Sequence, residues 1–193
     1  MSLVVAVASE ENVQTQLMDR LNNDHFHIAT VMNSLEKMFK QFPDEDIDWT
    51  TVSDMLDYLQ EYPDTVHHPL EDQLFDRVLD KGLTPAEREL VHANLAQHAE
   101  IINATLQLDQ DVSQILNDVV VPIDQVLKHF ERYIQLQRVH MRNENTHLFP
   151  LAERLLTMQD WRDVEAEYAN HVDPMFVLKQ GKFASLFEYI TDN

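Results

Sequence analysis

The chain has 193 residues, of which 44% are hydrophobic, so it can bury a core and is not expected to be disordered. Its 34 Asp and Glu residues outnumber its 14 Lys and Arg residues, and the formal net charge of -20 repels phosphate backbones and anionic lipid headgroups. We therefore expect neither a nucleic acid nor a membrane as partner. The absence of cysteine excludes disulfides, thiolate nucleophiles and cysteine-ligated clusters.

Residues that break regular structure are scarce in this chain, which has only two glycines and seven prolines. Such a composition favours a few long elements over many short strands. Between the breakers, apolar residues recur at the spacing of one helical face, as in Leu17, Leu21, Ile28, Met32 and Leu35. The sequence therefore predicts an all-α protein, and its length fits a single domain over residues 1–193.

The first half of the chain is predicted to contain two long helices. Its opening apolar run, LVVAVA, is too short to span a bilayer and lacks the basic region of a signal peptide, so a cytoplasmic location is expected. The first helix covers about residues 11–41 and is closed by the segment QFPDEDID. The second covers about residues 50–80 and is interrupted near Pro63 and Pro69.

The second half repeats this arrangement. Thr84 is the predicted N-cap of the third helix, with Pro85 at its first position and Glu87 completing a capping box. The fourth helix follows Pro122 and continues to about residue 157, and the tail from 160 to 190 adds one or two short helices. Because the connections are short, neighbouring helices run antiparallel, which predicts an up-down-up-down four-helix bundle over about residues 11–157.

The ten histidines contain an internal repeat. The spacing from His25 to His67 equals the spacing from His98 to His140. A single shift along the chain carries His25, His67 and Glu71 onto His98, His140 and Glu144. The apolar segments LFDRVL and LFPLAERLL follow the two HxxxE pairs, one residue out of step with each other. The repeat divides the chain into two equivalent helical hairpins.

This repeat predicts a metal site. Residues four apart lie on one face of a helix, so each HxxxE pair directs an imidazole and a carboxylate the same way. In a hairpin, ~20 residues up one helix and ~20 back down the next return the chain to the same height. Six inward groups then meet at one level, where two buried carboxylates need a neutralising partner. These groups are His25, His67, Glu71, His98, His140 and Glu144.

The donor set indicates which metals fit. Imidazoles and carboxylates without thiolates suit iron, manganese or zinc better than calcium or copper(I). Two glutamates that can bridge favour two ions ~3.5 Å apart. Ferritin-type bundles match less well, because they use Glu-x-x-His pairs at i, i+3 with two further glutamates.

Two ordinary interpretations stand beside the metal site. A single inward histidine is more often a hydrogen-bonded core residue, and an exposed HxxxE pair is usually a solvated helix face. Within HHPLED, Pro69 lies between His67 and Glu71 and disturbs their i, i+4 geometry unless a helix begins there. His68 is then an alternative ligand, or it pairs with Asp72 just outside the ligand set. We expect His27 to face solvent.

At these residues the chain resembles the bacterial hemerythrin-like (HHE cation-binding) domains. The resemblance rests on Asp24-His25, on HHPLED followed by LF, on Gln97-His98, and on HMRNE followed by LFP. It covers about residues 11–157, and the later DPMF and SLFEYI are similar to the tail of bacterial members. It implies a bundle around an oxo- or hydroxo-bridged di-iron centre, with terminal histidine ligands and two bridging glutamates. By position the histidines are His25, His67, His98 and His140, and the glutamates are Glu71 and Glu144.

The resemblance implies a protein that binds O2 or NO in sensing, storage or detoxification. One departure matters: oxygen-carrying hemerythrins of animals have an additional histidine on the third helix where this chain has Asn94. Fewer nitrogen ligands favour redox chemistry or iron release over simple oxygen carriage. The alternatives are therefore a di-iron enzyme that reduces nitric oxide or peroxide, an iron donor for iron–sulfur cluster repair, and a metal-stabilised interaction module. The sequence names no electron donor or protein partner.

Overall fold

The computed structural model describes residues 2–179 and 181–192, with the backbone alone for residues 2–12. Throughout these residues the regular structure is helical and contains no strand, which confirms the predicted all-α class. The prediction of a single domain over residues 1–193 stays a prediction.

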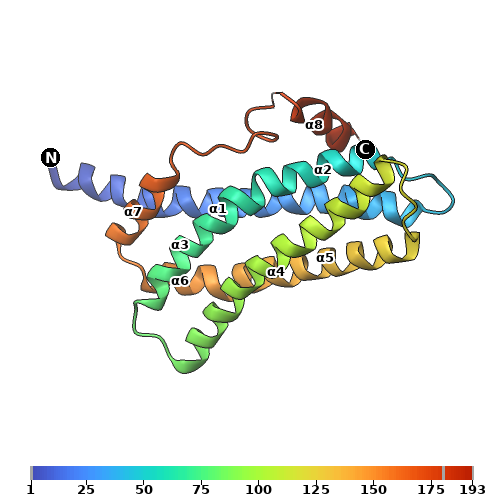
Figure 1. Cartoon of the computed structure of the whole chain (residues 1–193). Helices are drawn as coiled ribbons and strands as arrows, with labels where there is room; N and C mark the ends of the chain where they lie inside the picture. Colours follow the sequence, from blue (N-terminus) through green and yellow to red (C-terminus); the bar gives the residue numbers. More distant parts are fainter. Residues whose placement is uncertain (1, 180, 193) are drawn as a thin grey trace.

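Four long helical columns run side by side along the molecule and alternate in direction (Figure 1). The first is one helix and the third is one helix, whereas the second and fourth are each interrupted by a π-helical turn. In chain order the elements of the columns are α1 (Ser2–Gln41), α2 (Trp49–Glu61), η1 (Pro63–His67), α3 (His68–Leu79), α4 (Pro85–Leu116), α5 (Ile123–Asn143), η2 (Glu144–Leu148) and α6 (Phe149–Leu155). The predicted up-down-up-down bundle is thus confirmed.

Two shorter helices cover the outside of this bundle. Helix α7 (Met158–Tyr168) packs against α1 and α3, and α8 (Phe183–Asp192) packs against α2 and α1 (Figure 1). The predicted start of the third column is confirmed: the Thr84 hydroxyl accepts from the Glu87 backbone N–H, and the Glu87 carboxylate accepts from the Thr84 backbone N–H. Both bonds satisfy donors that a helix end would otherwise leave unpaired.

The π turn η1 explains how the second column passes the two prolines of its sequence. Pro63 begins η1, and Pro69 lies in the first turn of α3, directly after η1. The N–H of His68 donates to the Pro63 carbonyl five residues earlier, the hydrogen bond that defines a π turn. The predicted interruption is therefore a change of helix type within a continuous column.

The π turn η2 explains why the two halves of the repeat fall out of step. Glu71 is followed by Leu74 after three positions, whereas Glu144 is followed by the equivalent Leu148 after four. The extra residue lies within η2, where the N–H of Phe149 donates to the Glu144 carbonyl. Because a π turn accommodates one additional residue without breaking the column, both leucines remain buried.

The core consists of two hydrophobic clusters with a polar layer between them. One cluster includes Leu17, Leu21, Phe75, Leu148 and Trp161. The other includes Ile28, Leu35, Met55, Ile101 and Tyr133. Each column passes from one cluster to the other at the position of a predicted site residue; α1, for example, has His25 between Leu21 and Ile28. The apolar neighbours on both sides make an uncompensated charge in this layer costly.

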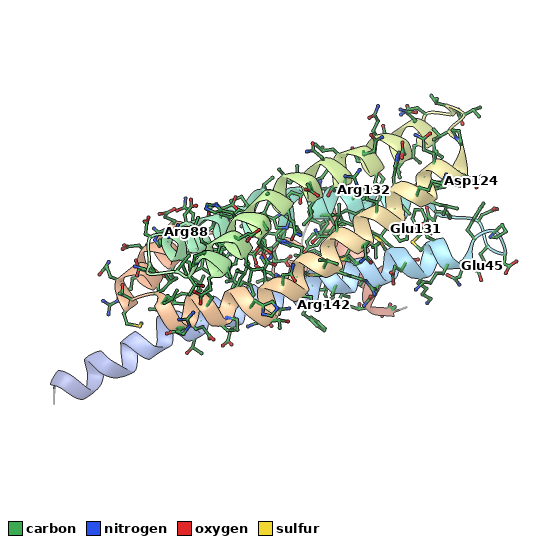
Figure 2. The ribbon with its side chains drawn as sticks, turned by 90° about the horizontal axis from the view of Figure 1, so that it is seen from below. Glu45, Arg88, Asp124, Glu131, Arg132 and Arg142 are labelled. Carbon is green, nitrogen blue, oxygen red and sulfur yellow. The ribbon has the colours of Figure 1, made fainter. Side chains whose placement is uncertain are left out.

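The outer faces of the bundle carry most of the charge. Figure 2 shows Arg88 on α4 and Glu131, Arg132 and Arg142 on α5 pointing away from the bundle. Two glutamates break this rule, since Glu71 and Glu144 are fully buried. Of the helices described, none combines the length and apolarity that a bilayer crossing requires.

Candidate metal centre

The polar layer brings together all six residues predicted from the repeat, together with His68. Every column contributes at least one of them, and no member is more than 5% exposed. The members are His25 of α1, His67 of η1, His68 and Glu71 of α3, His98 of α4, His140 of α5 and Glu144 of η2.

Glu71 lies between two pairs of histidines. Its Oε1 atom is 3.3 Å from Nε2 of His25 and 3.3 Å from Nε2 of His67. Its Oε2 atom is 3.5 Å from Nε2 of His98 and 4.0 Å from Nε2 of His140. We call the first pair the His25 subsite and the second pair the His98 subsite. One carboxylate therefore presents a different oxygen to each subsite.

Glu144 divides its oxygens in the same way. Oε2 is 3.3 Å from Nε2 of His25, whereas Oε1 is 3.1 Å from Nε2 of His140 and 3.6 Å from Nε2 of His98. Carboxylates and imidazoles at such separations can share cations placed between them. The buried carboxylates thus have the arrangement that bridging between two neighbouring ions requires.

Three of the four histidines in the subsites make a hydrogen bond through Nδ1, the ring nitrogen that is turned away from the glutamates. His67 Nδ1 donates to Asp24 Oδ2 at 3.3 Å, and His98 Nδ1 donates to Asp72 Oδ1 at 2.7 Å. His25 Nδ1 donates to the side-chain oxygen of Asn145 at 3.0 Å. These bonds place a proton on Nδ1, so Nε2 is the nitrogen that is directed at the carboxylates and can offer a lone pair to a cation. Metal-binding histidines are commonly oriented in this way.

Several atoms that face the centre have no hydrogen-bond partner among the described residues. They include Nε2 of His25, His98 and His140, both oxygens of Glu71 and Oε2 of Glu144. Buried polar atoms are normally satisfied, and leaving one unpaired costs about 1–3 kcal/mol. The unpaired atoms converge from four columns on one layer, so the donor set fits metal cations.

The carboxylates hold protons on two of the histidines when no cation is present. Burial alone lowers the pKa of His25, but Glu144 and Glu71 outweigh it and raise that pKa to about 10. For His98, burial is again outweighed, here by Asp72, Glu144 and Glu71, and the pKa rises to about 11. Cation binding at these nitrogens must therefore displace protons.

The remaining groups favour cation binding directly. Burial lowers the pKa of His140 to about 4 despite the nearby glutamates, so its imidazole is neutral at physiological pH. Burial raises the pKa of Glu71, but the surrounding histidines outweigh this effect and hold it well below its ordinary value. Both the neutral imidazole and the carboxylate offer lone pairs to a cation.

His67 and His68, which the sequence left as alternative ligands, both face the polar layer. The His67 ring lies against that of His25, with centroids 5.0 Å apart, and the His68 ring stacks on that of His98 at 4.7 Å. Asp72 does not pair with His68 but bonds to His98, and the carboxylate beside His68 is Asp64, at 3.3 Å from Nδ1. The two histidines thus lie next to different subsites.

Three residues around the site were not predicted to contact it. Asn94 donates to Glu144 Oε1 at 2.6 Å, and Asp24 and Asn145 orient histidines. Asn94 lies four residues before His98, so helical spacing could have placed it on the inward face. Asn145 gave no such signal, because its position depends on the π turn.

A cavity of about 680 Å³ opens beside the His25 subsite, between α1, Tyr62 just before η1, α7 and the segment after α7. Asp24 and Tyr62 lie in its wall, and the Tyr62 hydroxyl donates to the Asp24 carboxylate. His27 also lines this cavity and is not directed to solvent as expected. Its Nδ1 donates to Asp173 Oδ2 at 2.9 Å, and its ring stacks on Phe176.

Comparison with known proteins agrees with this geometry. The family described as the hemerythrin HHE cation binding domain matches residues 16–152, a range that contains all the members of the polar layer. Searches of curated proteins and of solved structures found no match. The family match covers most of the chain and the whole of the site, and the chain therefore belongs to the hemerythrin HHE cation-binding domain family.

Proposed function

We propose that this chain is a non-haem di-iron protein that binds O2 or NO at the polar layer of its bundle. The single observation that carries the proposal is the division of the carboxylate oxygens. Glu71 and Glu144 each present one oxygen to the His25 subsite and the other to the His98 subsite. This arrangement suits two ions ~3.5 Å apart, which both carboxylates would bridge.

Each residue has a role in this proposal. His25 and His67 would be terminal ligands of one ion, and His98 and His140 of the other. Asp24, Asp72 and Asn145 would fix the rings of His67, His98 and His25 through Nδ1 and so keep these three Nε2 atoms directed at an ion. Glu71 and Glu144 would neutralise most of the positive charge brought into the buried layer.

Iron is the metal that we propose, with manganese and zinc as alternatives. The donors are nitrogen and oxygen only, a set that suits these three metals. Ferrous iron would supply the electrons and the exchangeable coordination positions that O2, NO or peroxide need. Hydrophobic clusters lie on both sides of the layer, and we expect them to exclude bulk water and to admit only small ligands.

A second candidate, an enzyme that reduces nitric oxide or peroxide, is favoured by the contacts behind His67. Such reductions consume protons together with electrons, so they need a route for protons into the buried layer. Tyr62, in the wall of the 680 Å³ cavity, donates to Asp24, and Asp24 accepts from His67. This chain of hydrogen bonds offers a proton path from the cavity to the edge of the centre.

Mixing experiments separate the two candidates. The anaerobically iron-loaded protein is mixed with O2, NO or peroxide while its visible spectrum is followed. Spectral changes that reverse when the gas is removed support binding. Continued consumption of NO or peroxide over many turnovers with added dithionite supports the enzyme. An iron-loaded protein that responds to none of the three contradicts both and favours a metal-stabilised interaction module or an iron donor.

A further inference from the structure

We propose that His68 is a fifth imidazole ligand of the centre, bound to the ion in the His98 subsite. The inference rests on the proposed dinuclear function and deepens it. His67 and His68 would then act together, one on each ion, and not as alternatives. The His98 subsite would hold three imidazoles and the His25 subsite two, which makes the two ions unequal.

The geometry around His68 supports this assignment. Its ring stacks on His98 with centroids 4.7 Å apart, and it meets the His140 ring edge-on at 5.5 Å. One ring nitrogen of each of these three histidines lies within 4.8 Å of the other two. Two imidazole nitrogens on opposite sides of one ion are ~4.2 Å apart, twice a metal–nitrogen distance of ~2.1 Å. Small ring movements would therefore bring all three onto one ion.

The surroundings of His68 argue against an ordinary packing role. The residue is 1% exposed, and neither ring nitrogen has a hydrogen-bond partner in the part of the chain that the structure describes. A buried Nε2 atom without a hydrogen-bond partner is costly, whereas a lone pair directed at a cation removes that cost. Asp64 Oδ1 lies 3.3 Å from Nδ1, much as Asp24 lies 3.3 Å from Nδ1 of His67. A carboxylate beside Nδ1 leaves Nε2 for the ion.

The local backbone explains how two consecutive residues reach the same layer. In an α-helix neighbouring side chains diverge by ~100°, so one of a consecutive pair usually faces away from the interior. Here His67 ends the π turn and His68 begins α3. Both are 1% exposed, on a column that lies between α1 and α4, and they approach His25 and His98 respectively.

The test compares His68→Ala with the wild type after loading with isotopically enriched iron. The matched control is His92→Ala, which removes an exposed histidine of α4. Mössbauer spectra and iron per chain are measured with and without added imidazole, and circular dichroism checks the fold. We expect two unequal iron signals in the wild type and in the control. In His68→Ala we expect the affinity for one ion to fall about tenfold or more and to recover with imidazole.

Each other outcome is decisive. A His68→Ala protein with both wild-type iron signals overturns the fifth ligand and leaves the dinuclear proposal intact. Loss of iron that imidazole does not restore also overturns it, because His68 would then support the fold of the site. A wild-type protein that binds less than one iron per chain instead contradicts the proposed function itself.

Discussion

Two side chains, the amide of Asn94 and the imidazole of His140, hold the carboxylate of Glu144 in position. The amide of Asn94 donates to its Oε1 atom, and Nε2 of His140 lies 3.1 Å from the same oxygen. Its Oε2 atom has no hydrogen-bond partner among the described residues and lies 3.3 Å from Nε2 of His25. The side chain thus reaches both subsites, and one oxygen remains for a cation.

Replacing Glu144 by Gln tests this role with little change of shape. The amide nitrogen that replaces one oxygen is a donor and cannot bind a cation, so we expect bound iron to fall by at least half. Iron per chain is measured after anaerobic loading. The control, His147→Ala, removes an exposed histidine from the same π turn and should keep all its iron. A Glu144→Gln protein with wild-type iron content would contradict the proposed bridge.

Asp24 accepts a hydrogen bond from Nδ1 of His67 and so lies one bond away from the candidate metal centre. We expect Asp24→Asn to weaken iron binding by about 10–100-fold, because the carboxylate that orients the ring and strengthens its lone pair is lost. Competition with a coloured chelator measures the affinity. Asp19→Asn, on the exposed side of the same helix, should leave it unchanged. Equal affinities for both variants would mean that the Asp24–His67 bond does not serve the metal.

At the scale of elements, both π turns contribute residues to the polar layer or its immediate surroundings. The turn η1 ends at His67, and His68 follows it directly as the first residue of α3. The turn η2 accommodates one extra residue after Glu144. Through η2, Phe149 stacks on His25 at 5.3 Å, and Asn145 bonds to the same ring. The ring of His25 is therefore held by Phe149 against its face and by Asn145 at Nδ1.

Deletion of Thr146 tests this account of η2. Thr146 is exposed, and without it the second half of the repeat has the same spacing as the first. We therefore expect η2 to become α-helical, with the fold and the iron content retained. Deletion of the exposed Glu131 within α5 (Figure 2) is the comparison. It removes a residue from a regular helix, rotates one part of α5 against the other, and should lower the melting temperature.

Circular dichroism melts and iron analysis give the readout for this pair. If the Thr146 deletion is as damaging as the Glu131 deletion, the extra residue of η2 is required and does not simply extend a continuous column.

Sequence reasoning predicted the assembly of the six groups because the repeat has a simple geometric meaning. Equal spacing in two antiparallel hairpins brings His25, His67, His98 and His140 to one level, and the structure places them there. The π turns were not predicted: the one-residue offset after the HxxxE pairs is visible in the sequence, but helical periodicity alone does not indicate that a π turn accommodates it. For this reason His67 and His68 could not be separated from sequence alone.

Contacts with the last part of the chain could not be predicted from the sequence either. His27 was expected to face solvent, yet it bonds to Asp173, which also accepts from the Tyr58 hydroxyl and from two backbone N–H groups. These partners are far apart in the sequence, and no local pattern links them. Sequence periodicity predicts which face of a helix is buried, but not which distant segment covers it.

For the whole molecule, the metal-free protein is expected to lose stability on both sides of neutral pH. With burial outweighed by Glu144 and Glu71, the pKa of His25 is raised from 6.5 to about 10, so the folded state keeps a proton that the unfolded chain has released. The free energy of unfolding then falls as pH rises through this window. Burial lowers the pKa of His140 from 6.5 to about 4, so unfolding takes up a proton below 6.5 and stability falls with acid.

Thermal melts of the chelator-treated protein across both windows check this expectation. In the proposed centre iron would replace the proton on His25, so we expect the iron-loaded protein to have a flatter profile on the alkaline side and a higher melting temperature at neutral pH. A melting temperature of the metal-free protein that does not change from acid to alkaline pH would contradict the proposed protonation states of His25 and His140.

The central claim is that the polar layer holds two ions between two carboxylates. The most direct test is the amount of iron per chain after anaerobic loading with ferrous iron and removal of the excess, followed by the visible spectrum after oxidation. The account predicts about two irons per chain, together with the absorption of an oxo- or hydroxo-bridged ferric pair. Less than one iron per chain, with no such absorption, would contradict it.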